Sequence, residues 1–363
     1  MYEENNPIVC EDLDYMYENI NFAEKFKDST ILVTGCAGFL GYYFMKFFAR
    51  HADKLGIKKI IGLDKFIVSS PDWLNDLQAK TDGLVEVHTF DIISDDLSSI
   101  DGACDAEFVL HMASIASPTF YRQYPIETLD ANIWGLRKLL DIYCKKDNLR
   151  GFLMFSSSEI YGDPDPAFIP TAESYRGNVA SIGPRACYDE SKRFSETMCY
   201  LFAEKYNMPI AMARPFNNFG PGMSLNDKRV PADFAKAVIE GQDIEILSDG
   251  TPTRTFCYVA DAVLGYLKIL THGTFDVFNI GNPNPEISMR DFAKLNVEVG
   301  KEVFGYQGEV KFAKSEDADY MTDNPNRRCP IIDKARSELN YHPTIGVREG
   351  VERFMKFFKY EQG

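Results

Sequence analysis

The feature that most constrains the fold of this chain is a glycine-rich turn between an apolar run and an amphipathic helical pattern. The run Thr30–Thr34 (TILVT) is followed at once by Gly35–Gly41 (GCAGFLG), a GxxGxxG spacing. Glycines at such a junction let the chain turn tightly and bring backbone N–H groups close to a pyrophosphate, while the following helix N-terminus adds partial positive charge. The turn therefore predicts a dinucleotide-binding β–α unit, with these expected contacts: Gly35, Gly38, Phe39, Leu40 and Gly41.

Short apolar runs alternate with helical patterns along the rest of the chain. The runs are Lys59–Leu63, Leu84–Phe90, Glu107–Met112, Gly151–Phe155, Pro209–Ala213 and Phe275–Ile280. Nearly continuous apolar runs are typical of strands buried on both faces of a parallel sheet. We therefore expect an α/β fold with a Rossmann-type doubly wound parallel sheet.

The composition of the chain changes near residue 220, where Pro, Gly and polar turns become frequent and the helical patterns become shorter. This change predicts a smaller, mixed α/β lobe that binds substrate. We divide the chain into an acidic N-terminal extension (1–28), a Rossmann domain (29–215) and a mainly substrate-binding lobe (216–363). A strand near 275–280 is expected to return to the Rossmann sheet.

Charge and composition exclude several classes of protein. The 363 residues carry a net charge of −15 and are 45% apolar, which argues against disorder and against nucleic acid or anionic lipid as partners. Eight Cys without a CxxC pair and five scattered His predict no metal site. The acidic N-terminus does not have the pattern of a signal peptide, and no uncharged apolar run reaches the roughly 18 residues of a membrane span. We expect a cytoplasmic protein.

Two acidic residues follow predicted strands on the cofactor side. Asp64 closes the second strand, 23 residues beyond Gly41, where a carboxylate can bind a ribose diol and repel a 2′-phosphate. This placement favours NAD over NADP, although a solvated strand end would look the same. Asp91 follows the third strand, and we expect it on the adenine side.

A Tyr-x-x-x-Lys pair indicates proton transfer coupled to hydride transfer. Tyr188 and Lys192 are four residues apart on a predicted helix and so share one side of it. A fixed ammonium and a positively charged nicotinamide would lower the pKa of the phenol, which could then take a hydroxyl proton. Ser157, at the end of a predicted strand, is placed to share that proton, unless its Ser-rich turn only caps the next segment.

Together these residues resemble the extended short-chain dehydrogenase/reductase family, in its nucleotide-sugar epimerase/dehydratase branch, over roughly residues 29–358. Within that branch the chain is most similar to the UDP-glucuronate decarboxylases. The stretches that carry the similarity are His111–Pro118 (HMASIASP), Tyr124–Asn132 (YPIETLDAN), Ser157–Pro164 (SSEIYGDP), Gly183–Glu190 (GPRACYDE), Arg214–Gly220 (RPFNNFG), Asn226–Val230 (NDKRV), Thr253–Asp261 (TRTFCYVAD) and Pro325–Pro330 (PNRRCP).

The resemblance implies a reaction and roles for individual residues. Tyr188 and Lys192 would deprotonate the sugar C4 hydroxyl as hydride passes to NAD, and the C6 carboxylate would leave from the 4-ketone. Glu159 and Ser158 would handle the carboxylate and reprotonation at C5, with Arg254 orienting or releasing the carboxylate. Other implied contacts are Ala113 and Asn132 with the cofactor, and Asn217 and Arg229 with the nucleotide sugar. Arg185 and Tyr121 are substrate-binding candidates on spacing.

Three alternatives stay open. The first is a sugar-nucleotide 4,6-dehydratase, although those enzymes carry an Asp where this chain has Ser158. The second is an epimerase, although epimerases usually carry a small or apolar residue in place of Glu159. Ser157 replaces the usual Thr of the decarboxylases, and Ala180-Ser181 replaces an Asn-Pro step, so the substrate could be another uronate. A non-catalytic NAD-binding scaffold on the same fold is a third possibility.

The resemblance also implies a homodimer. The predicted helices Pro125–Cys144 and Arg185–Tyr206 carry apolar stripes at helical spacing, of which part is core. Relatives pair these helices across a two-fold axis, so we expect isologous contacts here.

Overall fold

The central element of the computed structural model, which describes residues 2–67, 71–314, 322 and 324–362, is a sheet of seven parallel strands. The strand order is β11-β6-β5-β4-β1-β2-β3. The bounds are β1 (Ser29–Thr34), β2 (Ile57–Asp64), β3 (Val85–Thr89), β4 (Phe108–His111), β5 (Gly151–Phe155), β6 (Ile210–Pro215) and β11 (Asp276–Ile280). Every pairing in this sheet is parallel, which confirms the doubly wound Rossmann-type fold.

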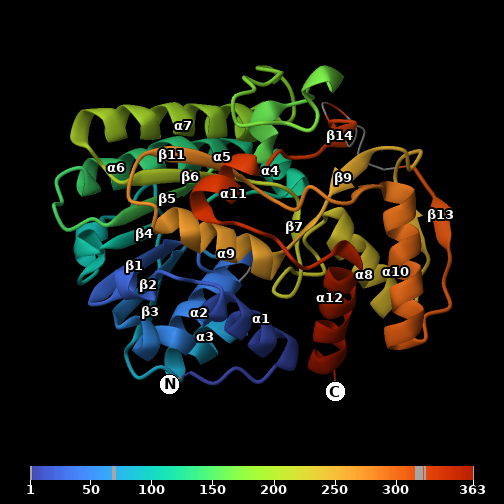
Figure 1. Ribbon diagram of the computed structural model, residues 1–363, viewed down its shortest axis with the longest axis horizontal. Coiled ribbons are helices and arrows are strands. Elements are labelled where there is room, and N and C mark those ends of the chain that lie inside the picture. Colours follow the sequence, from blue (N-terminus) through green and yellow to red (C-terminus); the bar gives the residue numbers. More distant parts are fainter. Residues whose placement is uncertain (1, 68–70, 315–321, 323, 363) are drawn as a thin grey trace.

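Helices cover both faces of the sheet and form two separate cores (Figure 1). Ile31 and Val33 of β1 face α2 (Phe39–Leu55) and α9 (Val259–Leu270), whereas Leu32 faces the opposite layer. That layer contains α5 (Pro125–Asp130), a π-type turn (Ala131–Gly135), α6 (Leu136–Tyr143) and α7 (Ala186–Tyr206). The alternation follows from the two-residue period of a strand, so each apolar run supplies both cores.

The smaller part of the molecule is built mainly from the second half of the chain. Its helices are α8 (Val230–Ile239), α10 (Met289–Phe304) and α12 (Val347–Glu361). Its short strands pair as β7 (Asn218–Phe219) with β10 (Cys257–Tyr258), β8 (Ile244–Ile246) with β13 (Val310–Phe312), and β9 (Thr253–Thr255) between β12 (Glu286–Ser288) and β14 (Arg327–Arg328). The strand expected near 275–280 is β11, and α9, which precedes it, also packs on the large sheet.

The N-terminal extension is packed into the fold. Helix α1 (Pro7–Glu18) contacts α2, α9 and α12. Its Asp12 is fully buried and accepts hydrogen bonds from Tyr43 and Tyr258, each at 2.6 Å, and from Arg353 at 3.0 Å. Burial raises the pKa of Asp12 to about 6. One carboxylate therefore joins the extension to three distant elements.

The remaining α-helices are α3 (Asp72–Ala79), α4 (Pro118–Gln123) and α11 (Asp333–Leu339), and a 3₁₀ turn spans Ser158–Tyr161. In the described parts of the chain, no helix is both long enough and apolar enough to cross a membrane.

Candidate active site

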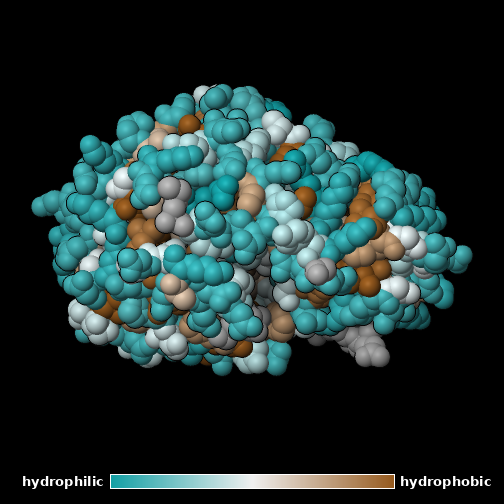
Figure 2. Space-filling model, turned by 90° about the horizontal axis from the view of Figure 1, so that it is seen from below, coloured by the Kyte–Doolittle hydropathy of each residue, from teal (hydrophilic) through white to brown (hydrophobic). Residues whose placement is uncertain are grey.

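A large cavity of about 1280 Å³ lies at the carboxyl ends of the strands, between the sheet and the smaller part of the molecule. Its wall includes the ends of β1, β2, β5 and β6 and the segments around 217–231 and 248–256. Figure 2 shows a mainly hydrophilic surface that is hollowed between the two parts. Ligands of open α/β sheets bind at this edge, so the cavity is the candidate active site.

The glycine turn forms the cofactor end of the cavity and leaves no room for side chains. Gly35 has φ +73°, and a Cβ there would lie 2.8 Å from the backbone nitrogen of Ala113. A Cβ on Gly41 would lie 2.2 Å from the carbonyl oxygen of Cys36. The expected cofactor residues that line the cavity are Gly35, Gly38, Phe39, Leu40, Gly41, Asp64, Asp91, Ala113, Tyr188 and Lys192.

The two acidic residues at this end are held differently. The Asp64 carboxylate accepts hydrogen bonds from the backbone of Ala37 (3.0 Å) and Phe66 (2.8 Å), and burial raises its pKa. Asp91 pairs with Lys65 at 2.6 Å. Asp91 thus neutralises the Lys65 ammonium, so no free positive charge of this pair faces the ribose side of the turn. The remaining acidic character there fits a ribose 2′-hydroxyl better than a 2′-phosphate.

Asn132 does not line the cavity, unlike the other residues expected to contact the cofactor. Its side-chain amide donates to Ser191 Oγ at 2.8 Å, and its backbone oxygen accepts from Ser195 Oγ at 2.9 Å. Both serines lie on α7, so Asn132 fixes the π-type turn against the helix that carries Tyr188.

Tyr188 and Lys192 are both buried on the cavity side of α7. Lys192 Nζ donates to the carbonyl oxygen of Phe155 at 2.8 Å and lies 5.6 Å from the centre of the Tyr188 ring. Burial lowers the pKa of Lys192 to about 7. Tyr121 stacks on Tyr188 with ring centres 5.1 Å apart and planes 11° from parallel.

Burial governs the protonation of Tyr188 in the protein without NAD. It raises the pKa of the phenol to about 12, although a hydrogen bond with Ser157 and the charge of Arg229 act in the opposite direction. The expected lowering of this pKa depends also on the positive charge of bound nicotinamide, so it stays a prediction for the NAD complex. The Ser157–Tyr188 contact does match the predicted proton-sharing arrangement.

Glu159 lies among arginines from three distant segments. One carboxylate oxygen is 2.7 Å from Arg328 Nη1, and the other is in direct contact with Arg185 Nη2. Arg328 Nη1 also donates to Ser158 Oγ at 3.0 Å. Burial alone would raise the pKa of Glu159, but Arg185, Arg328 and Arg254 outweigh it and lower the pKa to about 2. We call Glu159 with these three arginines the arginine cage.

Arg328 is a residue that the sequence interpretation missed. Its stretch, Pro325–Pro330, contributed to the resemblance, yet no role was assigned to it. The structure places its buried side chain between Ser158 and Glu159, whereas the expected Arg254 guanidinium is held by Asn324 Oδ1 (3.0 Å) and the Pro325 carbonyl (2.7 Å). Arg254 still lines the cavity and acts on Glu159 through its charge.

Asp189 is a second missed residue and adjoins the cage. Its Oδ2 lies 3.5 Å from Arg185 Nε, so Arg185 stands between two carboxylates. Burial and the nearby charge of Glu159 raise the pKa of Asp189 to about 7. The negative charge of the cage is therefore concentrated on Glu159.

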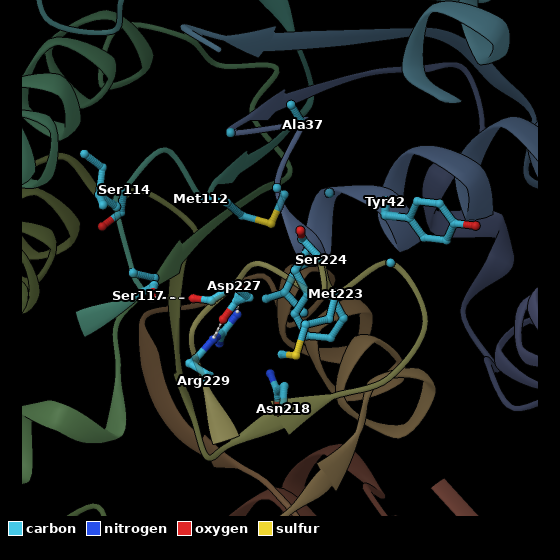
Figure 3. A pocket seen from close by; sticks show the side chains of 18 of the residues that line it. Ala37, Tyr42, Met112, Ser114, Ser117, Asn218, Met223, Ser224, Asp227 and Arg229 are labelled. Atoms are coloured by element: carbon cyan, nitrogen blue, oxygen red, sulfur yellow. Dashed lines mark hydrogen bonds and ion pairs between the residues drawn. The ribbon is translucent and has the colours of Figure 1, made fainter. Parts of the chain in front are cut away.

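The residues expected to bind the nucleotide sugar all line the cavity. Asn217 has φ +41°, and its side-chain amide donates to the carbonyl oxygen of Thr255 at 2.9 Å. Arg229 forms a two-point ion pair with Asp227, whose backbone oxygen accepts from Ser117 Oγ at 2.7 Å (Figure 3). Tyr121, Arg185, Asn217, Arg229 and Arg254 all line the cavity.

Comparison with known proteins identifies one family and several similar proteins. The model of the family described as "NAD dependent epimerase/dehydratase family" matches residues 31–281. UDP-glucuronic acid decarboxylase 1 of Xenopus tropicalis is 33% identical over 347 residues, covering 95% of this chain and 76% of that protein. UDP-glucuronic acid decarboxylase 6 of Arabidopsis thaliana is 32% identical over 333 residues, covering 92% of this chain and 90% of that protein.

Solved structures share the fold. The UDP-glucuronic acid 4-epimerase of Bacillus cereus, in complex with UDP-glucuronic acid and NAD, is similar with a TM-score of 0.74 and 25% identity, covering 92% of this chain and 99% of that one. A dTDP-glucose 4,6-dehydratase of Bacillus anthracis in complex with NAD has a TM-score of 0.73 at 19% identity, covering 92% of this chain and 97% of that one. The second likeness concerns the fold alone.

Proposed function

The chain belongs to the NAD dependent epimerase/dehydratase family, and we propose that it is an NAD-dependent decarboxylase of a UDP-uronate such as UDP-glucuronate. The observation that carries this proposal is the arginine cage beside Tyr188. Arg185 and Arg254 line the cavity, and Arg328 lies buried against Glu159, so three guanidinium charges outweigh the Glu159 carboxylate and leave this wall with a positive charge that suits a substrate carboxylate. A neutral hexose would have no use for that charge.

The glycine turn fits the cofactor of the family. Glycine at positions 35 and 41 lets the turn pack directly against the backbone of Ala113 and Cys36, and this brings the N-terminus of α2 to the cavity, where a pyrophosphate would bind. Asp64 would hold the ribose, and Tyr188 and Lys192 would lie at the nicotinamide end. When bound, NAD supplies a hydride acceptor, and later a hydride donor, for the sugar carbon C4.

The first proton transfer depends on Tyr188 and Ser157. Their hydrogen bond gives the proton of the C4 hydroxyl a path from the sugar to the phenol. Arg229 favours the phenolate electrostatically, and Lys192 is fixed one turn away by the Phe155 carbonyl. Tyr121, stacked on the phenol, keeps the ring in one orientation.

Loss of carbon dioxide follows from the position of the new ketone. The C4 ketone is β to the C6 carboxylate, so the C5–C6 bond breaks and its electron pair moves into the enolate. Arg254 and Arg185, which line the cavity, orient the carboxylate before it leaves, and Arg328 holds Glu159 and Ser158 in place behind them. Glu159 and Ser158 then position the proton that adds to C5, and reduction of C4 gives a pentose nucleotide, or its omission leaves the 4-keto pentose.

A second candidate is 4-epimerisation of the same uronate. It is favoured by the structural likeness to the UDP-glucuronic acid 4-epimerase of Bacillus cereus, whose substrate carries the same carboxylate. A 4,6-dehydratase is less consistent with the site, because Ser158 cannot replace an acid of comparable pKa toward a departing C6 hydroxyl.

Mass spectrometry of the products distinguishes these reactions. The purified protein is incubated with NAD and UDP-glucuronate, and in parallel with a UDP-hexose. Loss of carbon dioxide from the uronate supports the proposal, whereas an unchanged mass with a new sugar indicates epimerisation and loss of water from the hexose indicates dehydration. In Tyr188→Phe the decarboxylation rate should fall by roughly 10³-fold or more, because the phenol no longer carries the proton.

The protein is also proposed to be a homodimer. Four apolar side chains are exposed on adjacent helices: Ile126 on α5, Trp134 on the π-type turn, and Phe194 and Leu201 on α7. Such a patch supports an interface between two copies. We expect a dimer in sedimentation at micromolar concentration and a monomer after Trp134→Glu; a monomeric unmodified protein would contradict this.

Free thiols at all eight cysteines support the cytoplasm as the compartment.

A further inference from the structure

The wall of the cavity that faces the glycine turn contains an ion pair between two residues of one loop, Asp227 and Arg229 (Figure 3). Arg229 Nη2 lies 2.8 Å from Asp227 Oδ2, and Arg229 Nε contacts Asp227 Oδ1, so both carboxylate oxygens engage the guanidinium. Both side chains line the cavity, with exposed fractions of 32% for Arg229 and 15% for Asp227. One donor edge of Arg229 is therefore occupied by an anion of the same chain.

Contacts with two other segments hold this ion pair in the cavity wall. Ser117 Oγ donates to the Asp227 carbonyl at 2.7 Å and so ties the loop to the segment after β4. The Arg229 guanidinium lies 5.8 Å from the centre of the Phe39 ring, at the first residue of α2, and its charge reaches the phenol of Tyr188. Lys228, between the pair, has φ +68°, a conformation that is uncommon for a residue with a Cβ.

A carboxylate and a phosphate use the same donor edge of a guanidinium. Arginine binds either group through two parallel N–H bonds, so a diphosphate that takes Arg229 through this edge must displace Asp227.

We propose that Asp227 is a built-in competitor of the substrate diphosphate: it occupies Arg229 until a nucleoside diphosphate displaces it, and thereby weakens nucleotide binding. The inference rests on the proposed function in one respect, since it takes the substrate to be a nucleotide sugar. It gives Asp227 an effect opposite in sign to that of a residue that merely orients Arg229. An orienting carboxylate strengthens phosphate binding, whereas a competing carboxylate weakens it.

Calorimetric titration of the NAD-loaded protein with UDP measures this sign without turnover. Asp227→Asn should tighten UDP binding by about fivefold, the size expected for a partly exposed ion pair. Arg229→Ala should weaken binding, and the double variant should bind like Arg229→Ala alone, because the competitor has nothing left to occupy. Uridine, which has no phosphate, should bind Asp227→Asn and the unmodified protein equally.

Asp233→Asn is the matched control, since it removes a negative charge near Asp227 that is not paired with Arg229. It should leave UDP affinity within about twofold at pH 8. Retained NAD binding in each variant shows that the fold is intact. An unchanged or weaker affinity in Asp227→Asn, or a gain that persists without Arg229, would overturn the inference while leaving the proposed function in place. Absence of UDP binding by the unmodified protein would overturn both.

Discussion

The two ends of the cavity are built in different ways. The cofactor end comes from one contiguous stretch, Gly35–Gly41, with Asp64 beside it, and its shape depends on backbone atoms that leave no space for a Cβ. The arginine cage comes from four separate segments, and its shape depends on full charges that face one another. The comparison teaches that the cofactor end is sensitive to added volume, whereas the cage is sensitive to a change of charge.

The largest expected effect tests the charge sensitivity of the cage. Glu159→Gln keeps the volume but leaves Arg185 and Arg328 facing each other without their shared anion. Decarboxylation should fall by roughly 10³-fold, while NAD affinity stays within about twofold. Steady-state rates and NAD titration measure both quantities. Glu190→Gln, a half-buried position on α7 outside the cavity lining, is the control, and near-normal turnover in Glu159→Gln would remove the cage from the mechanism.

The next effect tests the volume sensitivity of the cofactor end. Gly41→Ala places a Cβ 2.2 Å from the Cys36 carbonyl oxygen, so the turn must shift. We expect NAD affinity to fall by about 100-fold and the free energy of unfolding by about 2 kcal/mol. Gly346→Ala, where nothing lies within 4 Å, should change neither quantity. Normal NAD binding by Gly41→Ala would show that the turn is not the cofactor site.

A smaller effect separates two arginines of the cage. Arg328 bridges Ser158 and Glu159, and lysine cannot make both contacts, so Arg328→Lys should lower turnover by about 30-fold. Arg254→Lys keeps the charge through which Arg254 acts on Glu159 and should lose only about threefold. Parallel kinetics of the two variants suffice as a test. A larger loss at Arg254 would contradict an action through charge alone and would indicate direct contact of its guanidinium with the substrate carboxylate.

The smallest effect concerns the free energy of unfolding and depends on Lys192, at the boundary between the two ends of the cavity. Burial lowers the pKa of Lys192 from 10.5 to about 7, so the unfolded chain binds more protons than the folded protein between these values. The destabilisation of the folded protein by the buried Lys192 charge is complete below pH 7 and disappears as the pH rises toward 10.5. The free energy of unfolding should therefore increase by about 1 kcal/mol per pH unit in this range.

Urea unfolding of the protein without added NAD at pH 7, 8 and 9 measures this slope. Lys192→Met should lack it, and the difference between the two proteins isolates the lysine from other titrating groups. The pKa of Tyr188 is raised to about 12, so its opposite contribution begins only above pH 10. Equal slopes in both proteins would mean that Lys192 stays charged in the fold.

The sequence interpretation was most successful where chemistry is local. The glycine turn, the strand alternation and the Tyr188–Lys192 spacing each lie within a few residues, and local rules of backbone geometry govern them. Arg328 and Asp189 were missed because their importance arises from Glu159, which lies on another segment. Asn132 was assigned to the cofactor, yet it binds α7, because a helix face cannot be oriented before its neighbour is known.

The amino-acid sequence by itself determined the Rossmann-type sheet, the family and NAD as its cofactor, since these depend on periodicity and on residue types at short spacing; the contacts of the glycine turn and the decarboxylation stay proposals. Only the tertiary structure decided how the charges are balanced: which arginine reaches Glu159, that the Tyr188 pKa rises, and that Asp227 occupies Arg229. The physical reason is that the free energy of a charge depends on its burial and on every other charge nearby, and both are set only when distant segments pack together.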